Sequence, residues 1–127
     1  MEKLMYYKEY DLNKISINLL WSYISTPTGL ATWFADEVKA DGKNISFFWA
    51  KEEHKAEISG MRQGSHIRFH WTDDNNPKTY FELKILYNEL VSNVILVVTD
   101  FAEQQEIDDC KKLWDEQIST LRKKLGT

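Results

Sequence analysis

Apolar and polar residues alternate along most of the chain between residues 38 and 100. A period of two is typical of β-strands that bury one face against a core and leave the other in solvent. Groups of turn-forming residues interrupt the alternation at short intervals, as antiparallel hairpins require. The turns are predicted at Asp41-Gly42, Gln63-Gly64, 73–77 and Asn88-Glu89. The strands between them are predicted at 38–41, 44–50, 54–62, 65–72, 79–87 and 90–100.

The two ends of this meander pattern carry further strand signals. Alternate apolar residues predict another strand at 4–12, with Lys8 as the exception. Its apolar residues are Leu4, Tyr6, Tyr10 and Leu12. The last strand contains five consecutive apolar residues at 94–98, so both of its faces are apolar. We therefore expect this strand to be central and covered on both sides.

Two short helices are predicted between the first strand and the meander. The first spans 14–24, with Asn13 as its N-cap, and its apolar residues recur at helical spacing. They are Ile15, Leu19, Leu20 and Tyr23. The second begins at Pro27, where the missing N–H is tolerated, and Thr26 supplies the cap. It carries Leu30, Trp33 and Phe34 on one face.

The C-terminal segment predicts one long amphipathic helix. Asp100 to Glu103 has the form of a capping box, and Gly126 is placed to end the helix after Leu125. At 1.5 Å per residue the helix is roughly 34 Å long, enough to lie across a whole sheet. Gln117 lies at the edge of the apolar arc, where an amide must reach solvent or a hydrogen-bond partner. The arc consists of Ile107, Cys110, Trp114, Ile118, Leu121 and Leu125.

The composition fits one α+β domain over residues 1–127. The chain has 16 Lys and Arg against 20 Asp and Glu, and its net charge of −4 argues against non-specific binding of nucleic acid. The longest strongly apolar run, 94–98, is far shorter than the ~20 residues of a membrane-spanning helix. Cys110 is the single cysteine, and residues 1–5 lack the apolar run of a secretory signal. We therefore expect a reducing, cytoplasmic setting.

Two stretches carry a family resemblance. The stretch from Leu20 to Phe34 contains a tryptophan, a loop with proline, a leucine and a second tryptophan. Further on, Thr99-Asp100-Phe101-Ala102 is followed by Leu113-Trp114. Both resemble passages of Aha-type proteins, which are named for activation of a heat-shock ATPase chaperone and are START-like members of the SRPBCC superfamily. The resemblance implies the Bet v 1-like helix-grip fold, in which the sheet curls around the long helix and leaves a hydrophobic cavity.

What the resemblance implies for function is a small hydrophobic or amphipathic ligand in that cavity, with no catalytic residue, cofactor or metal carried over. The inward aromatic residues can fill this space as a core or line it as a pocket. Glu57 is included because either face of its strand could hold it, and a carboxylate in an aromatic cavity would have a raised pKa. The mouth is expected among Leu30, Trp33 and Phe34, near 73–77. The candidate cavity residues are Leu30, Trp33, Phe34, Trp49, Glu57, Phe69, Trp71, Phe81, Tyr87, Cys110, Trp114, Gln117, Ile118 and Leu121.

Other candidate groups favour ordinary structural roles. His66 and His70 lie about 13 Å apart along one strand, too far to share a metal ion. Cys110 on the apolar helix face is predicted to be a packed thiol. A non-enzymatic binding module is therefore the leading hypothesis. The alternatives are a chaperone-associated protein-interaction module with a filled core and a cavity enzyme such as a cyclase or hydrolase, and a homodimer stays open.

Overall fold

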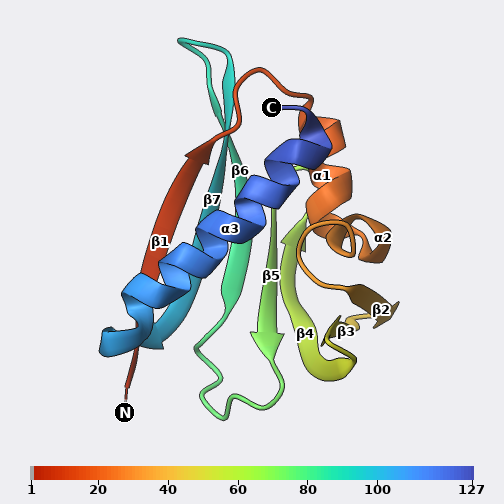
Figure 1. Cartoon of the computed structure of the whole chain (residues 1–127), viewed down its shortest axis with the longest axis vertical. Coiled ribbons are helices and arrows are strands. Elements are labelled where there is room, and N and C mark those ends of the chain that lie inside the picture. Colours follow the sequence, from red (N-terminus) through yellow and green to blue (C-terminus); the bar gives the residue numbers. More distant parts are fainter. Residues whose placement is uncertain (1) are drawn as a thin grey trace.

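The computed structural model describes residues 2–127 and contains one antiparallel sheet crossed by a long helix (Figure 1). The strands are β1 (Lys3–Asp11), β2 (Glu37–Asp41), β3 (Asn44–Trp49), β4 (Glu52–Arg62), β5 (His66–Trp71), β6 (Phe81–Asn88) and β7 (Asn93–Glu103). The helices are α1 (Ile17–Ser25), α2 (Pro27–Leu30), the 3-10 helix η1 (Gln104–Glu106) and α3 (Ile107–Leu125). This arrangement confirms the α+β class and the strand pattern predicted from the sequence.

The sheet has the strand order β1-β7-β6-β5-β4-β3-β2. Strands β2 to β7 therefore form a meander in which each strand pairs with the next, and β1 is added beside β7. Gly42 and Gly64 adopt positive φ angles of 61° and 75° in two of the predicted turns, a conformation that suits glycine. The ladder between β4 and β5 shifts its register between Ile58 and Gly60. Such a bulge bends a strand locally.

We call the face of the sheet that α3 covers the inner face, and the opposite one the outer face. Figure 1 shows α3 running diagonally over the inner face, with α1 and α2 beside its C-terminal half. The inward residues of α3 are Trp114, Ile118 and Leu121, which confirms the predicted helical arc. They pack with alternate strand residues in one core. Its largest fully buried side chains are Phe47, Phe69, Phe81, Leu12, Leu20, Ile24, Leu30, Ile67, Leu83, Leu96, Ile118 and Leu121.

The predicted helix start at Asp100 is wrong. Strand β7 continues to Glu103, because its residues pair with β1 in an unbroken ladder that ends at Lys3 and Glu103. The backbone hydrogen bonds of this ladder hold the segment extended, so long-range pairing overrides the local capping signature. The end of α3 is as predicted: Gly126 has φ 77°, and its N–H donates to the Arg122 carbonyl.

Strand β7 also differs from its predicted position. It is second from the edge of the sheet rather than central. Val94, Leu96 and Val98 are buried on the inner face, whereas Ile95 and Val97 on the outer face are only half-buried. The expectation of cover on both faces is therefore wrong, because the long helix packs against one face of this strand.

The boundaries of α1 and the exposure of one strand residue also differ from expectation. Ser16, not Asn13, is the N-cap, because its hydroxyl accepts a hydrogen bond from the Leu19 N–H. Leu19 itself is exposed, and Ile24 is buried in its place. Tyr87 was expected to face inward but is 51% exposed, because the β6–β7 hairpin extends past the helices that cover the core (Figure 1). Within residues 2–127, no helix has the length and hydropathy needed to cross a membrane.

Candidate functional site

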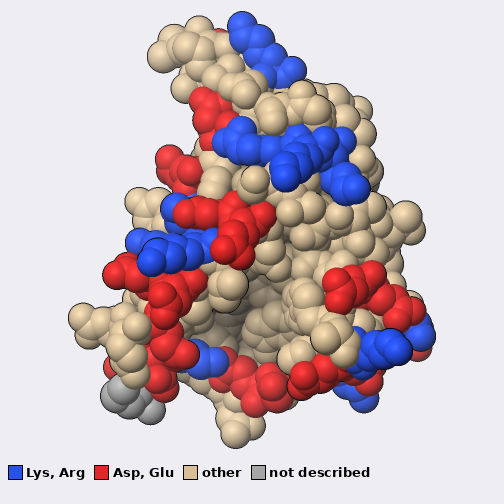
Figure 2. All heavy atoms as spheres, in the orientation of Figure 1, with Lys and Arg blue, Asp and Glu red and all other residues tan. Residues whose placement is uncertain are grey.

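A hollow opens beside α3 on the inner face, as Figure 2 shows near the centre of the molecule. The cavity here has a volume of about 160 Å³. At the ~30 Å³ that a water molecule occupies in the liquid, this is space for about five waters. We call it the aromatic recess. Its lining residues are Phe34, Trp49, Trp71, Asp100, Cys110, Leu113, Trp114 and Gln117.

The aromatic walls of the recess are held together through one backbone carbonyl. The Phe34 carbonyl accepts hydrogen bonds from the Trp49 indole N–H at 2.9 Å and from the Gln117 amide at 3.0 Å. The Phe34 ring stacks on Trp114, with 5.6 Å between centroids, and meets Trp49 edge-on at 5.4 Å. The chain after α2, strand β3 and helix α3 are thereby tied at one point. The amide of Gln117 finds its hydrogen-bond partner in the protein.

Asp100 places a carboxylate in this aromatic setting. It faces inward because β7 pairs it with Tyr6, a buried residue of β1. Its Oδ2 accepts hydrogen bonds from the Trp114 indole N–H at 3.0 Å and the Tyr6 hydroxyl at 3.2 Å, and its Oδ1 accepts one from the Phe101 N–H at 2.8 Å. Burial raises the pKa of Asp100 above its ordinary value, although these three donors oppose the effect.

The neighbouring groups respond to the same environment. Burial raises the pKa of the Tyr6 hydroxyl, and the Asp100 charge raises it further. Burial likewise raises the pKa of the Cys110 thiol, with a further contribution from Asp100. Cys110 is half-buried and is a thiol at neutral pH, as its predicted packing role requires.

A groove adjoins the recess between the chain after α2 and helix α3. Its volume is about 480 Å³, and it shares Phe34, Trp49 and Gln117 with the recess. Trp33 lines this groove, and its indole N–H donates to the Tyr23 carbonyl at 2.9 Å. The groove includes Trp33 and Phe34 of the predicted mouth, whereas Leu30 is buried and no residue of 73–77 lines the groove.

Comparison with known proteins decides the family. The family model for the START-like superfamily domain matches residues 1–127. The chain belongs to the START-like superfamily. The resemblance seen in the sequence is thereby confirmed. No curated protein sequence matches this START-like chain.

Several solved structures are similar to this START-like chain. BfR322 from Bacteroides fragilis, solved by NMR, has 52% identity and a TM-score of 0.70, and the match covers 98% of this chain and 92% of that one. The Aha1 dimer from Colwellia psychrerythraea has 15% identity and a TM-score of 0.74, with 98% and 96% of the two chains covered. BH1534 from Bacillus halodurans has 16% identity and a TM-score of 0.77, with 98% and 99% covered. The last two likenesses show the fold alone.

The START-like fold divides the predicted cavity residues into groups. The recess brings together Phe34, Trp49, Trp71, Cys110, Trp114 and Gln117. Sealed core positions hold Leu30, Phe69, Phe81, Ile118 and Leu121. Glu57 and Tyr87 require correction. Glu57 pairs with His70 on the outer face, where it is exposed, because its place in the alternation is opposite to that of buried Ala56. Tyr87 lies on the exposed hairpin described above.

Sequence reasoning missed Asp100 and Leu113 as lining residues of the recess. For Asp100 a signal was present in the strand alternation, because residue 100 has the same parity as inward Leu96 and Val98. The predicted strand 90–100 already ended at this residue, and its alternation turns the carboxylate inward. Interpreting Asp100 as a helix cap led to its omission from the predicted cavity residues. Leu113 is exposed and lies at the rim.

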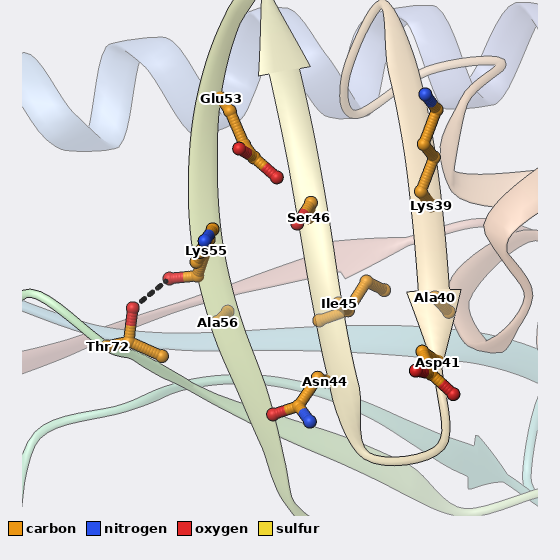
Figure 3. Close-up of a pocket in the computed structure, with 10 residues that line it drawn as sticks. All are labelled: Lys39, Ala40, Asp41, Asn44, Ile45, Ser46, Glu53, Lys55, Ala56 and Thr72. Atoms are coloured by element: carbon orange, nitrogen blue, oxygen red, sulfur yellow. Dashed lines mark hydrogen bonds between the residues drawn. The ribbon is translucent and has the colours of Figure 1, made fainter.

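A larger hollow of about 500 Å³ lies over the outer face of β2, β3 and β4 (Figure 3). None of its ten lining residues is aromatic. Figure 3 shows the short side chain of Ser46 between the charged Lys39 and Glu53. Lys39 forms its ion pair with Glu37, at 3.7 Å, rather than with Glu53. We therefore place the candidate site in the aromatic recess, where aromatic walls and a buried carboxylate meet.

Proposed function

We propose that this START-like domain binds a small apolar or amphipathic molecule in the aromatic recess. The observation that supports the proposal is the recess itself, a cavity between α3 and the sheet with aromatic rings at four of its eight lining residues. Ligand sites in proteins are typically concave and apolar, with a few polar groups that fix orientation. Here Asp100 supplies such a polar group. Gln117 already donates to Phe34, so it contributes to the wall.

The size of the recess limits the ligand. About 160 Å³ accommodates a few non-hydrogen atoms, because large rings such as Trp71 and Trp114 occupy the adjoining space. The groove beside it is larger and is lined partly by polar residues, among them Asp36 and Thr120. A ligand with a compact group in the recess and a polar remainder in the groove fits both volumes.

Two measurements test the proposal. Native mass spectrometry and solvent extraction of the purified protein should detect a retained small molecule. Titration with a neutral compact alcohol, 3,3-dimethylbutan-1-ol, should shift the NMR signals of the Trp49 and Trp114 indole N–H groups, because both rings line the recess.

A variant pair makes this test specific. Leu113→Trp places a large ring at the rim of the recess and should weaken binding of the alcohol at least tenfold. Lys112→Trp adds the same ring at the neighbouring exposed position and should leave binding unchanged. Absence of both a retained molecule and any indole shift would remove the proposed function.

A homodimer or other protein-interaction role is the second candidate. The β6–β7 hairpin exposes four apolar residues, Leu86, Tyr87, Leu90 and Val91, of which Leu90 is 96% exposed. Contiguous exposed apolar residues mark interaction sites on many proteins. The structurally similar Colwellia protein is described as a dimer. Sedimentation velocity over a concentration series should show self-association that Leu90→Glu abolishes, and a monomer at every concentration would exclude the homodimer.

A further inference from the structure

The aromatic recess has one acidic lining residue, Asp100. Of the eight lining residues, Asp100 is the only one with a carboxyl group. The other ionisable residue, Cys110, is a thiol at neutral pH because its pKa is raised. Its three hydrogen bonds come from neutral groups, namely an indole, a phenol and a backbone amide. Within residues 2–127, none of the ion pairs formed by Lys, Arg or His involves Asp100. The protein therefore holds a largely buried carboxylate beside a cavity without a cationic partner in contact.

The carboxylate retains capacity for one more contact. Two carboxylate oxygens offer about four lone-pair positions, and the three donors occupy three of them. Buried carboxylates in proteins are usually paired with a cation, because removing an unpaired charge from water is costly. Asp100 also lines the recess directly, so a group bound there can reach it.

The rings around Asp100 favour the same kind of ligand. Trp49, Trp71, Trp114 and Phe34 all line the recess. Aromatic rings attract cations through the negative charge of their faces, and tryptophan does so most strongly. Proteins recognise quaternary ammonium groups in cages of aromatic rings, which the methyl groups contact. A carboxylate in the same cavity wall balances the positive charge.

The surroundings of the recess are acidic as well. Figure 2 shows Asp and Glu side chains along the lower edge of the hollow. The loop after β5 contributes Asp73 and Asp74 at this end of the molecule, and the start of β4 contributes Glu52, which pairs with Trp49. Lys3, which binds Asp74 at 2.9 Å, offsets part of this charge. A negative rim raises the local concentration of cations at a cavity mouth.

We propose that the aromatic recess binds a small alkylammonium cation, with the positive charge beside Asp100 and the alkyl groups against the tryptophan rings. This inference rests on the proposed function, because it names the chemical class of the ligand for the same cavity. The volume of about 160 Å³ suits a trimethylammonium-sized group. The remainder of a larger amphipathic molecule extends into the adjoining groove.

The test compares two probes of the same shape on the unmodified protein. Choline carries a trimethylammonium group, and 3,3-dimethylbutan-1-ol replaces its nitrogen by carbon and is neutral. Their dissociation constants are measured from the indole N–H signals, among which that of Trp114 reports on its bond to Asp100. Choline should bind at least tenfold more tightly at low ionic strength, and added salt should weaken choline alone.

Two carboxylate variants test whether Asp100 is responsible for the preference for choline. Asp100→Asn keeps the shape but removes the charge, so the affinity for choline should fall at least tenfold while that for the alcohol is unchanged. Asp115→Asn is the matched control, because Asp115 accepts a hydrogen bond from the Tyr10 hydroxyl at 2.7 Å much as Asp100 does from Tyr6. Asp115 lies outside the recess, and its variant should bind both probes as the unmodified protein does.

The outcomes separate this inference from the proposed function. If the alcohol binds as tightly as choline, the cation inference is overturned and the proposed apolar site stands. If neither probe binds and the purified protein carries no retained molecule, both are overturned. If choline binds more tightly but Asp100→Asn, folded by its NMR spectrum, retains that preference, the role of Asp100 is refuted. The probe comparison does not depend on any variant, so it decides the ligand class even if Asp100→Asn fails to fold.

Discussion

Replacement of Trp114 tests how α3 is held on the sheet. Trp114 is 6% exposed, its ring stacks on Phe34, and its indole donates to Asp100 at 3.0 Å. Loss of a buried tryptophan side chain costs about 3–5 kcal/mol, and loss of a hydrogen bond to a charged group costs about 1.5–3 kcal/mol. Because Trp114→Ala removes both, we expect its free energy of unfolding to fall by about 5 kcal/mol.

A second variant separates the two contributions. Trp114→Phe retains most of the ring packing against Phe34 but removes the indole donor, so we expect a loss of about 2 kcal/mol. Guanidinium unfolding curves followed by far-UV circular dichroism give both values. Lys112→Ala, on the exposed side of the same helix, is the control and should change the free energy by less than about 0.5 kcal/mol. A loss below about 1 kcal/mol for Trp114→Ala, with an unchanged m-value, would show that Trp114 does not hold α3 on the sheet.

Three further predictions concern backbone packing and pH. Gly29→Ala should lower the midpoint of thermal unfolding sharply, because a Cβ at this position would lie 2.1 Å from the Ser22 carbonyl oxygen. Thr28→Ala, the control, should have a small effect. Equal midpoints for the two variants would contradict the close packing of α1 and α2. The bonds from Thr79, Asn76 and Lys3 lower the pKa of Asp74 to about 2. The folded state therefore favours the ionised form of Asp74 more than the unfolded state does. The stability that this carboxylate contributes is present above pH 3.8 and is lost as the pH falls toward 2. The stability of Asp74→Asn should therefore fall less than that of the unmodified protein as the pH is lowered. Identical acid-unfolding profiles of the two proteins would exclude a stabilising role of the Asp74 carboxylate. For Asp100 the sign is opposite: its raised pKa means that the unmodified protein loses stability relative to Asp100→Asn as the pH rises from 3.8 through the folded pKa. Urea melts of both proteins between pH 3.5 and 7 measure this difference, and a constant difference would argue against burial of the charge.

The elements of the fold could be predicted from the sequence because their signals are local. The period of two between residues 38 and 100 gave the strands, and the helical spacing of Trp114, Ile118 and Leu121 gave the inner face of α3. Gly126 marked the end of that helix through its left-handed backbone conformation. Each of these depends on side-chain direction or backbone conformation within a few residues.

The candidate site could be predicted only in part, because it depends on contacts between distant segments. Six aromatic or helix-borne residues of the recess followed from periodicity, yet nothing local distinguishes a ring that lines a cavity from one that fills a core. That distinction depends on long-range contacts such as those of the Phe34 carbonyl, which accepts hydrogen bonds from Trp49 and Gln117 and joins three segments beside the recess.

Asp100 shows most clearly what the tertiary structure decided. Its local sequence has the form of a helix cap, but pairing with Tyr6 in β1, 94 residues away, keeps the segment in a strand and turns the carboxylate inward. Glu57 shows the converse, since the register with His70 turns its carboxylate to the outer face. A shift of one residue in the pairing register of a strand moves each of its side chains to the opposite face of the sheet. The sequence by itself therefore determined which residues form strands and helices, whereas strand pairing decided which carboxylate meets the aromatic rings.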